Sequence, residues 1–385
     1  MPGMDKLSQL LLERPIAISG MKRKGIKVVA TNVGDYVPHE LIHAAGAVPV
    51  CQIHGGDPEP VEAAHAVVVR FQCAFARAQM GYRLLRDQAY YELTDLLIVA
   101  TTCQHMRKFA DLWEYHTGVE TWRLGLPQEF QTDRAMAYYI DSLRRMKEKL
   151  EQVTGNEITD EKLAESIGIY NRLRTLLKRI SLMRQSSFSL ISALDFIKLN
   201  HASFLLDPVV MGELLTSLCE TLENGRKVPI NGKQRLLLLT PNIALGDYKL
   251  FGLVEEAGGE IVIEEVGEGV RAYWENVGVN GADLLESLAF KYLRQRCPAC
   301  FMRSAMKTRL ANVVRLAEDF AVKGVLWYQL TLCETFDIEF AYFAERFKEK
   351  GLPVLKLDSD YDASDRGRMK TRISAFMESL ERRSA

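Results

Sequence analysis

The stretch "GIKVVATNVGDYVPHELIHAAGAVPV" (25–50) decides the fold, because "KQRLLLLTPNIALGDYKLFGLVEEAGGEIVI" (233–263) repeats its plan. Each begins with an apolar run typical of a buried β-strand and continues through a loop that contains Gly-Asp-Tyr. A short amphipathic helix, an Ala-Gly pair and another apolar run follow. The Ala-Gly glycine lies ten residues after the loop tyrosine in both stretches. Each stretch therefore predicts a strand–helix–strand unit, and together they predict an internal repeat.

Cysteines also fall at matching places in the two halves. An arginine stands three residues before Cys73 and three before Cys297. The apolar runs "DLLIVATTC" and "GVLWYQLTLC" end at Cys103 and Cys333. In open parallel sheets, binding sites form beyond the carboxyl ends of the strands. We therefore expect Cys103 and Cys333 to face a cleft between two lobes.

The predicted architecture is α/β, with two Rossmann-like or flavodoxin-like parallel-sheet lobes related by the repeat. We expect an N-terminal lobe over 1–130, a helical segment over 131–228 and a C-terminal lobe over 229–385. The middle segment contains long stretches with helical periodicity, and Thr159 followed by two acids is typical of a helix N-cap. We expect this helical insertion to be structural and to carry no chemistry.

Composition limits the classes of function. The 385 residues carry a formal net charge of −1, without a basic tract interleaved with aromatics, which disfavours nucleic-acid binding. No apolar stretch approaches the roughly 18 residues of a membrane span. The N-terminal residues lack the continuous apolar region of a signal peptide. We therefore expect a cytoplasmic protein that contacts neither membrane nor nucleic acid.

Seven cysteines in a reducing compartment point away from a disulfide framework and leave several interpretations open. Zinc would use Cys297–Cys300 or the histidines His105 and His116, but no second Cys-x-x-Cys pair is present. Cys103 as a nucleophile with His105 as base, or a redox pair at Cys297–Cys300, are further alternatives. For Cys219, in "LLTSLCETL", we favour a buried thiol. Distant cysteines that converge at strand ends also suit an iron–sulfur cluster.

Six segments, in order along almost the whole chain, resemble the 2-hydroxyacyl-CoA dehydratase and benzoyl-CoA reductase family, in particular its iron–sulfur subunits. They are "YVPHELIHAAGAVPV" (36–50), "CAFARAQMG" (73–81), "TTCQHMRKFADLWEY" (101–115), "RCPAC" (296–300), "LCETFDIEF" (332–340) and "GLPVLKLDSDYDASDRGRMKTRISAFME" (351–378). The resemblance implies two α/β domains with a [4Fe–4S] cluster between them. The cysteines that match its three ligands are Cys73, Cys103 and Cys333.

The resemblance also implies partners and a chemistry. A separate ATP-hydrolysing iron–sulfur activator protein supplies one electron at low potential. Dehydratases pass it to a 2-hydroxyacyl-CoA thioester, whose ketyl radical expels the adjacent hydroxyl, whereas reductases deliver electrons to an aromatic acyl-CoA ring. Members work as pairs of related subunits, so we expect a homologous second subunit or a homodimer.

Some polar residues near these motifs are candidates for roles in that chemistry. His39 and Glu40 lie in the segment that lines the family's pocket, and we predict that they act on a proton or a hydroxyl. An exposed acid at a helix N-terminus is the alternative for Glu40. Tyr36 and His43 are weaker candidates for the same role, and Thr101 and Thr102 are candidate hydrogen-bond donors to the cluster. The candidate contacts for the phosphates of CoA, which are equally interpretable as solvated surface charges, are Lys22, Arg23, Lys24, Arg107 and Lys108.

A related branch of the family carries a double-cubane [8Fe–9S] cluster on six cysteines and reduces small molecules. A second cubane here would use Cys51, Cys297 and Cys300. That branch also has a cysteine shortly before the Thr-Thr-Cys strand, where this chain reads "RDQAYYELTD". The double-cubane reductase and a non-catalytic electron-transfer protein are the alternatives to the acyl-CoA enzyme.

Overall fold

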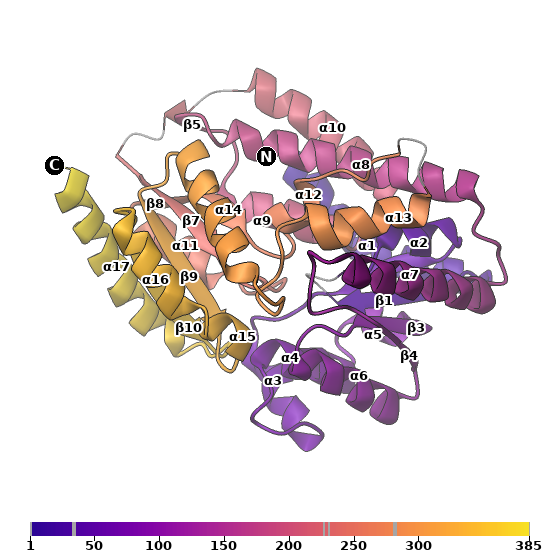
Figure 1. Ribbon diagram of the computed structural model, residues 1–385. Coiled ribbons are helices and arrows are strands. Elements are labelled where there is room, and N and C mark those ends of the chain that lie inside the picture. The colour runs from indigo at the N-terminus through magenta and orange to yellow at the C-terminus, as the bar shows by residue number, and fades with distance from the viewer. Residues whose placement is uncertain (1, 33–35, 226–227, 230–231, 280–282, 385) are drawn as a thin grey trace.

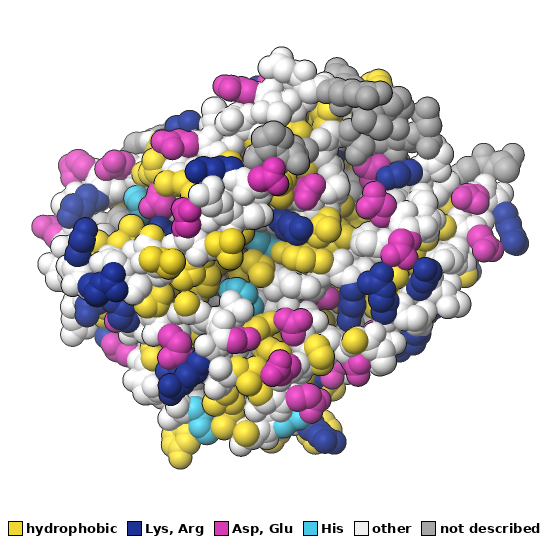
Figure 2. All heavy atoms as spheres, turned by 180° about the vertical axis from the view of Figure 1, so that it is seen from behind, with side chains coloured by type: hydrophobic (Ala, Val, Ile, Leu, Met, Phe, Trp, Pro, Cys, Tyr) yellow, Lys and Arg dark blue, Asp and Glu magenta, His cyan; other side chains and the backbone are white. Residues whose placement is uncertain are grey.

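The computed structural model describes residues 2–32, 36–225, 228–229, 232–279 and 283–384 (Figure 1). Gly34 and Asp35, of the first Gly-Asp-Tyr loop, lie outside the described residues. No described helix is both long and apolar enough to cross a bilayer. Figure 2 shows basic and acidic side chains interspersed over one face of the molecule.

The first half forms a four-stranded, entirely parallel sheet of order β2-β1-β3-β4. Its strands are β1 (Val28–Asn32), β2 (Val48–Gln52), β3 (Leu96–Ala100) and β4 (Glu120–Leu124). Its helices are α1 (Pro2–Arg23), α2 (His39–Ala44), α3 (Pro58–Ala63), η1 (Ala64–Ala66), α4 (Ala74–Leu85), α5 (Ala89–Leu93) and α6 (Gln104–Thr117). The strands β1, β2 and β3 are buried along their whole length, which explains their continuous apolar runs.

The second half forms another parallel sheet, of order β8-β7-β9-β10. Its strands are β7 (Gln234–Leu239), β8 (Gly259–Glu265), β9 (Gly324–Leu330) and β10 (Val354–Ser359). Its helices are α11 (Lys249–Glu256), α12 (Val270–Tyr273), α13 (Leu284–Ala289), the π-helix η2 (Phe290–Gln295), α14 (Ala305–Asp319), α15 (Glu334–Asp337), α16 (Phe340–Glu349) and α17 (Asp365–Ser384). Counted within each half, both sheets have the strand order 2-1-3-4, which confirms the prediction of two parallel-sheet lobes.

Between the halves lie α7 (Asp133–Thr154), α8 (Asp160–Met183), α9 (Ala193–Ser203) and α10 (Pro208–Asn224), with the short strands β5 (Phe188–Ser189) and β6 (Val228–Pro229). Thr159 caps α8 as predicted, because its side chain accepts a hydrogen bond from Lys162 N. One apolar core joins β1 and β3 to α7, α8 and residues from 277–305. The division of the chain at 130/131 and 228/229 stays a prediction.

The Gly-Asp-Tyr loop of the second half lies directly against backbone of the first half. Leu245 N donates to Ile53 O at 2.8 Å, and Gly55 N donates to Leu245 O at 3.0 Å. Gly246 has a φ of +114°, and a Cβ there would stand 2.2 Å from Gly55 O. Only glycine permits both this backbone conformation and this approach. The glycine of the repeated motif is therefore a lobe-to-lobe contact point.

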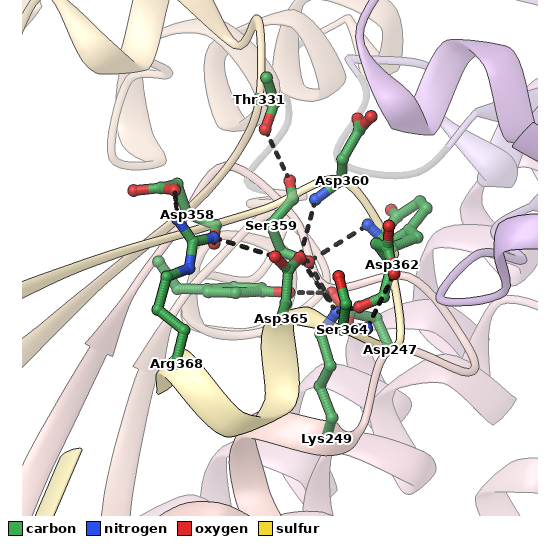
Figure 3. A network of polar contacts seen from close by, with 12 residues as sticks. Asp247, Lys249, Thr331, Asp358, Ser359, Asp360, Asp362, Ser364, Asp365 and Arg368 are labelled. Carbon is green, nitrogen blue, oxygen red and sulfur yellow. Dashed lines mark hydrogen bonds and ion pairs between the residues drawn. The ribbon is translucent and has the colours of Figure 1, made fainter. Parts of the chain in front are cut away.

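A charged network supports the same contact. Arg77, on α4 and only 4% exposed, pairs with Asp360 of the second half at 2.6 Å. Figure 3 shows the turn after β10 that carries Asp360. There Asp360 N and Ser359 Oγ donate to Asp365 at 3.3 and 2.8 Å, and Lys249 Nζ donates to Ser359 Oγ at 2.6 Å. Lys249 at the start of α11 and Asp365 at the start of α17 thus fix the turn whose Asp360 pairs with Arg77 of the first half.

We predict that Gly246→Ala destabilises the protein by about 3 kcal/mol, because the new Cβ collides with Gly55 O at a φ unfavourable for alanine. Gly252→Ala is the matched control, since an added Cβ there meets nothing within 4 Å inside α11. It should be neutral or stabilising by up to about 1 kcal/mol. Urea unfolding of both variants measures the difference, and equal stabilities would contradict the contact.

Candidate functional site

Four thiols line one cavity where the two sheets meet: those of Cys73, Cys103, Cys300 and Cys333. Cys103 follows β3 and Cys333 follows β9, the two strands at which the strand order reverses in each sheet. The structure therefore brings together the three cysteines that the family resemblance singled out, and it adds Cys300.

The three predicted cysteines occupy equivalent local positions. Cys73, Cys103 and Cys333 are the N-cap residues of α4, α6 and α15. Backbone N–H groups of Phe75 and Ala76 point to Cys73, and that of Phe336 points to Cys333. At Cys73 and Cys333, these N–H groups at a helix start favour the anionic form of the sulfur.

Desolvation opposes that anionic form. Burial, followed by the neighbouring Cys103 thiol, raises the pKa of Cys73 to about 12. Burial, followed by Cys300, Cys73 and Cys103, raises the pKa of Cys333 well above its usual range. Thiols packed together in this way ionise only when a cationic group joins them. Soft sulfur donors suit iron–sulfur clusters, and the buried Arg271 lines the same cavity with a positive charge.

Within the described part of the chain, no three His, Cys, Asp or Glu side chains gather where one metal ion would bind. The zinc alternative, including His105 and His116, therefore finds no site there. A cluster has a different requirement, because each of its thiolates binds a separate iron.

The remaining cysteines lie elsewhere. Cys51, in β2, is fully buried in the apolar core of the first half. Cys297 lines a different cavity, beside Glu265. Cys219 is buried in α10 with its Sγ 3.9 Å from Leu176 O, which confirms the prediction of a buried thiol. The three cysteines named for a second cubane are thus not brought together.

A second, polar cavity adjoins the thiol cavity, because Asn32 lines both. The side chains of His39, Arg174, Lys291, Tyr292 and Arg296 are among its polar groups. Asn32 Oδ1 is buried and has no hydrogen-bond partner among the residues that the structure describes. It is therefore a free acceptor at the boundary between the two cavities.

His39, predicted to act on a proton or hydroxyl, lines this polar cavity. Its Nε2 is 2.8 Å from Thr31 Oγ1. Burial lowers the pKa of His39 to about 4, with Glu40 opposing the shift. At neutral pH the ring is uncharged, so it offers a hydrogen-bond donor and an acceptor rather than a positive charge.

Glu40 is fully buried, so the alternative of an exposed helix-terminal acid is wrong. It forms an ion pair with Arg174 and accepts a hydrogen bond from Tyr292 Oη at 3.0 Å. Burial raises its pKa, but Arg174 and Lys291 outweigh burial and leave the pKa below its ordinary value of 4.5. Glu40 therefore stays ionised and holds in place two groups that line the cavity.

Arg174, Lys291 and Arg296 carry the cavity's basic groups and were not predicted as site residues. Arg174 belongs to α8, so the helical insertion, expected to be structural only, contributes a side chain to this cavity. Burial, followed by the charge of Arg174, lowers the pKa of Lys291 well below its usual range, and its Nζ donates to Ala272 O at 3.3 Å. The cavity thus offers two buried guanidinium groups and several further hydrogen-bond donors, which suit a carbonyl or carboxylate oxygen.

Loop 240–244, which follows β7, closes the thiol cavity through Pro241 and Asn242. Glu268 accepts a hydrogen bond from Ile243 N at 2.6 Å, and Arg271 donates to Pro241 O at 2.6 Å. Burial raises the pKa of Glu268 to about 8. The side chains of Glu268 and Arg271 therefore hold loop 240–244 in place through its backbone.

The other candidates support the scaffold. Tyr36 Oη accepts a hydrogen bond from Ala299 N at 3.0 Å, and His43 Nδ1 lies 3.1 Å from Ser166 Oγ. Thr101 Oγ1 accepts from Leu126 N at 3.0 Å, while Thr102 lines the thiol cavity. The basic residues proposed for CoA phosphates line neither cavity: Lys22 pairs with Asp95, Lys108 pairs with Asp111, and Arg107 is exposed.

The fold and the thiol cavity define a two-lobe α/β protein with its site between two parallel sheets. The chain belongs to the family described as 2-hydroxyglutaryl-CoA dehydratase, D-component, whose model matches residues 35–380.

Curated relatives align over most of their length. The Escherichia coli (strain K12) protein "Putative dehydratase subunit YjiM" is 26% identical, over 98% of this chain and 97% of that protein. The "(R)-phenyllactyl-CoA dehydratase beta subunit" of Clostridium sporogenes is 20% identical over 90% of both chains. A benzoyl-CoA reductase subunit of Thauera aromatica is 21% identical, over 90% of this chain and 89% of that one.

We predict that Glu40→Gln lowers the free energy of unfolding by about 3 kcal/mol at pH 7, because it leaves the buried Arg174 charge without its carboxylate. Since folding lowers the pKa of Glu40, its stabilisation is present above pH 4.5 and lost as the pH falls further. The difference from wild type should therefore shrink in acid.

Glu148→Gln, on the exposed face of α7, is the control and should change stability by less than about 0.5 kcal/mol. Urea unfolding between pH 3.5 and 7 makes the comparison. A Glu40→Gln effect that does not vary with pH would argue against an ionised, paired Glu40.

Proposed function

We propose that the chain is the iron–sulfur subunit of an enzyme that depends on an ATP-hydrolysing activator and acts on an acyl-CoA thioester. The reaction class is that of the 2-hydroxyacyl-CoA dehydratases and benzoyl-CoA reductases. The observation that carries this proposal is the shared cavity of Cys73, Cys103 and Cys333 in a chain that belongs to the family.

Cys73, Cys103 and Cys333, each at the start of a helix, would hold a [4Fe–4S] cluster, with backbone N–H groups near the sulfur atoms of Cys73 and Cys333. When bound, the cluster supplies electrons one at a time at low potential. Leu332, just before Cys333, has a φ of +67°, a strained conformation for leucine that costs about 1–3 kcal/mol. Such strain is consistent with a functional demand on the direction of the Cys333 side chain.

The adjoining polar cavity would take the acyl end of the thioester. The Arg174 guanidinium, held by Glu40 and Tyr292, is placed to donate to an oxygen of the substrate. His39, uncharged, is placed to orient a hydroxyl or to accept its proton. Aromatic rings of Tyr170 and Phe204 complete the wall and exclude water. In this proposal Glu40 acts through Arg174 and is a positioning residue.

Two partners follow from this proposal. Three curated relatives are named as beta subunits of their enzymes, which supports a second, related subunit or a homodimer here. An ATP-dependent iron–sulfur activator protein would supply the electron. The proposed location is the cytoplasm, where reducing conditions preserve thiols.

Iron and sulfide content tests the proposal. After anaerobic purification and reconstitution, we expect about four irons per chain in the wild type. Cys103→Ala should hold less iron than wild type and keep the circular dichroism of the folded chain, because it removes one cavity thiol. Cys219→Ala is the control and should keep the wild-type iron content, since that thiol lies in the apolar core.

Equal iron in Cys103→Ala and wild type would overturn the ligand assignment. About eight irons per wild-type chain would instead favour the double-cubane alternative. No iron in reconstituted wild type would leave the family fold without its redox centre.

A further inference from the structure

The thiol cavity has one more cysteine than the resemblance predicts. Cys300 lines it together with Cys73, Cys103 and Cys333. Its Sγ lies 3.5 Å from Thr335 Oγ1, and Thr335, two residues after Cys333, lines the same cavity. Two thiols thus come from each half of the chain.

The segment that carries Cys300 is anchored on both sides. Ala299 N donates to Tyr36 Oη at 3.0 Å, and Arg303 N donates to Gln128 O at 2.7 Å. Both acceptors, Tyr36 and Gln128, belong to the N-terminal lobe as predicted from sequence, whereas Thr335 belongs to the second half of the chain. The position of Cys300 is therefore determined by contacts with both halves.

The Cys-x-x-Cys pair is divided between two cavities. Cys297 lines a separate cavity and faces the carboxylate of Glu265, whereas Cys300 lines the thiol cavity. Arg271 lines both cavities and lies between them. A redox disulfide or a metal knuckle would need both sulfurs on one side. Only Cys300 is placed to act with the other three thiols.

We propose that Cys300 is the fourth thiolate ligand of the cluster, so that every iron is held by this chain. The inference rests on the proposed function, because it assumes the [4Fe–4S] cluster. The Cys300 sulfur, its proton released to solvent, would hold the one iron for which the other three cysteines supply no thiolate. A cluster held in this way would supply electrons without an open iron, and the substrate would lie in the polar cavity beyond Asn32.

Mild oxidation of the reconstituted full-length chain tests this. A cluster with three thiolates readily loses its open iron to ferricyanide and gives the electron paramagnetic resonance signal of a three-iron cluster. We expect wild type to keep its irons and give no such signal. Cys300→Ala should lose about one iron in four and gain the signal. Cys297→Ala is the matched control, three residues away, and should behave as wild type.

A wild type that yields the three-iron signal as readily as Cys300→Ala would overturn the fourth ligand. Because the wild-type result alone decides this, the test holds even where Cys300→Ala fails to fold. Iron content before oxidation distinguishes failure of the Cys300 assignment from failure of the proposed function. A wild type without a cluster would overturn the proposed function and the Cys300 assignment together. A wild-type four-iron cluster that loses iron on oxidation would overturn only the role of Cys300.

Discussion

The contact between Gly246 and the backbone at Gly55 sets the distance between the two sheets. Because Gly246 has no side chain, its backbone contacts Gly55 O directly, and a change of side-chain rotamer cannot alter the distance between these two segments. The ion pair between Arg77 of the first half and Asp360 of the second half joins the same two lobes. Because Cys103 and Cys333 follow strands of different sheets, this spacing decides whether their sulfur atoms share one cavity. The candidate redox centre is therefore a consequence of how the lobes meet.

Beside the thiols, the protein keeps several ionisable groups away from water. Burying the Glu40–Arg174 pair is costly, and replacement by apolar residues would often be neutral or stabilising. A fold that needed only stability would have little reason for it. In this chain the pair aims a guanidinium into the cavity while Lys291 and His39, with lowered pKa values, contribute donors of little charge. In the proposed function, the adjoining cavities would therefore separate electron supply from recognition of polar ligand atoms.

Much of the fold could be predicted from sequence, because the apolar runs and the repeated Gly-Asp-Tyr loop are local patterns. The positions of Cys103 and Cys333 followed from strand ends. Arg174 could not be found in this way, since it lies in an ordinary amphipathic helix and its burial depends on α2 packing against α8. Spacing also could not tell Cys297 from Cys300, because the cavity that each thiol lines depends on how distant segments hold this stretch, as when Tyr36 accepts a hydrogen bond from Ala299 N.

The two copies of the Gly-Asp-Tyr motif make different contacts with the opposite half of the chain. The tyrosine of the first copy, Tyr36, accepts a hydrogen bond from Ala299 in the second half, and the glycine of the second copy, Gly246, receives the backbone of the first half. Each repeat thus completes the other, and a half-length chain would expose an unmatched amide or an uncovered glycine turn. The two halves are therefore an interdependent pair, in which neither half is a spare copy of the other.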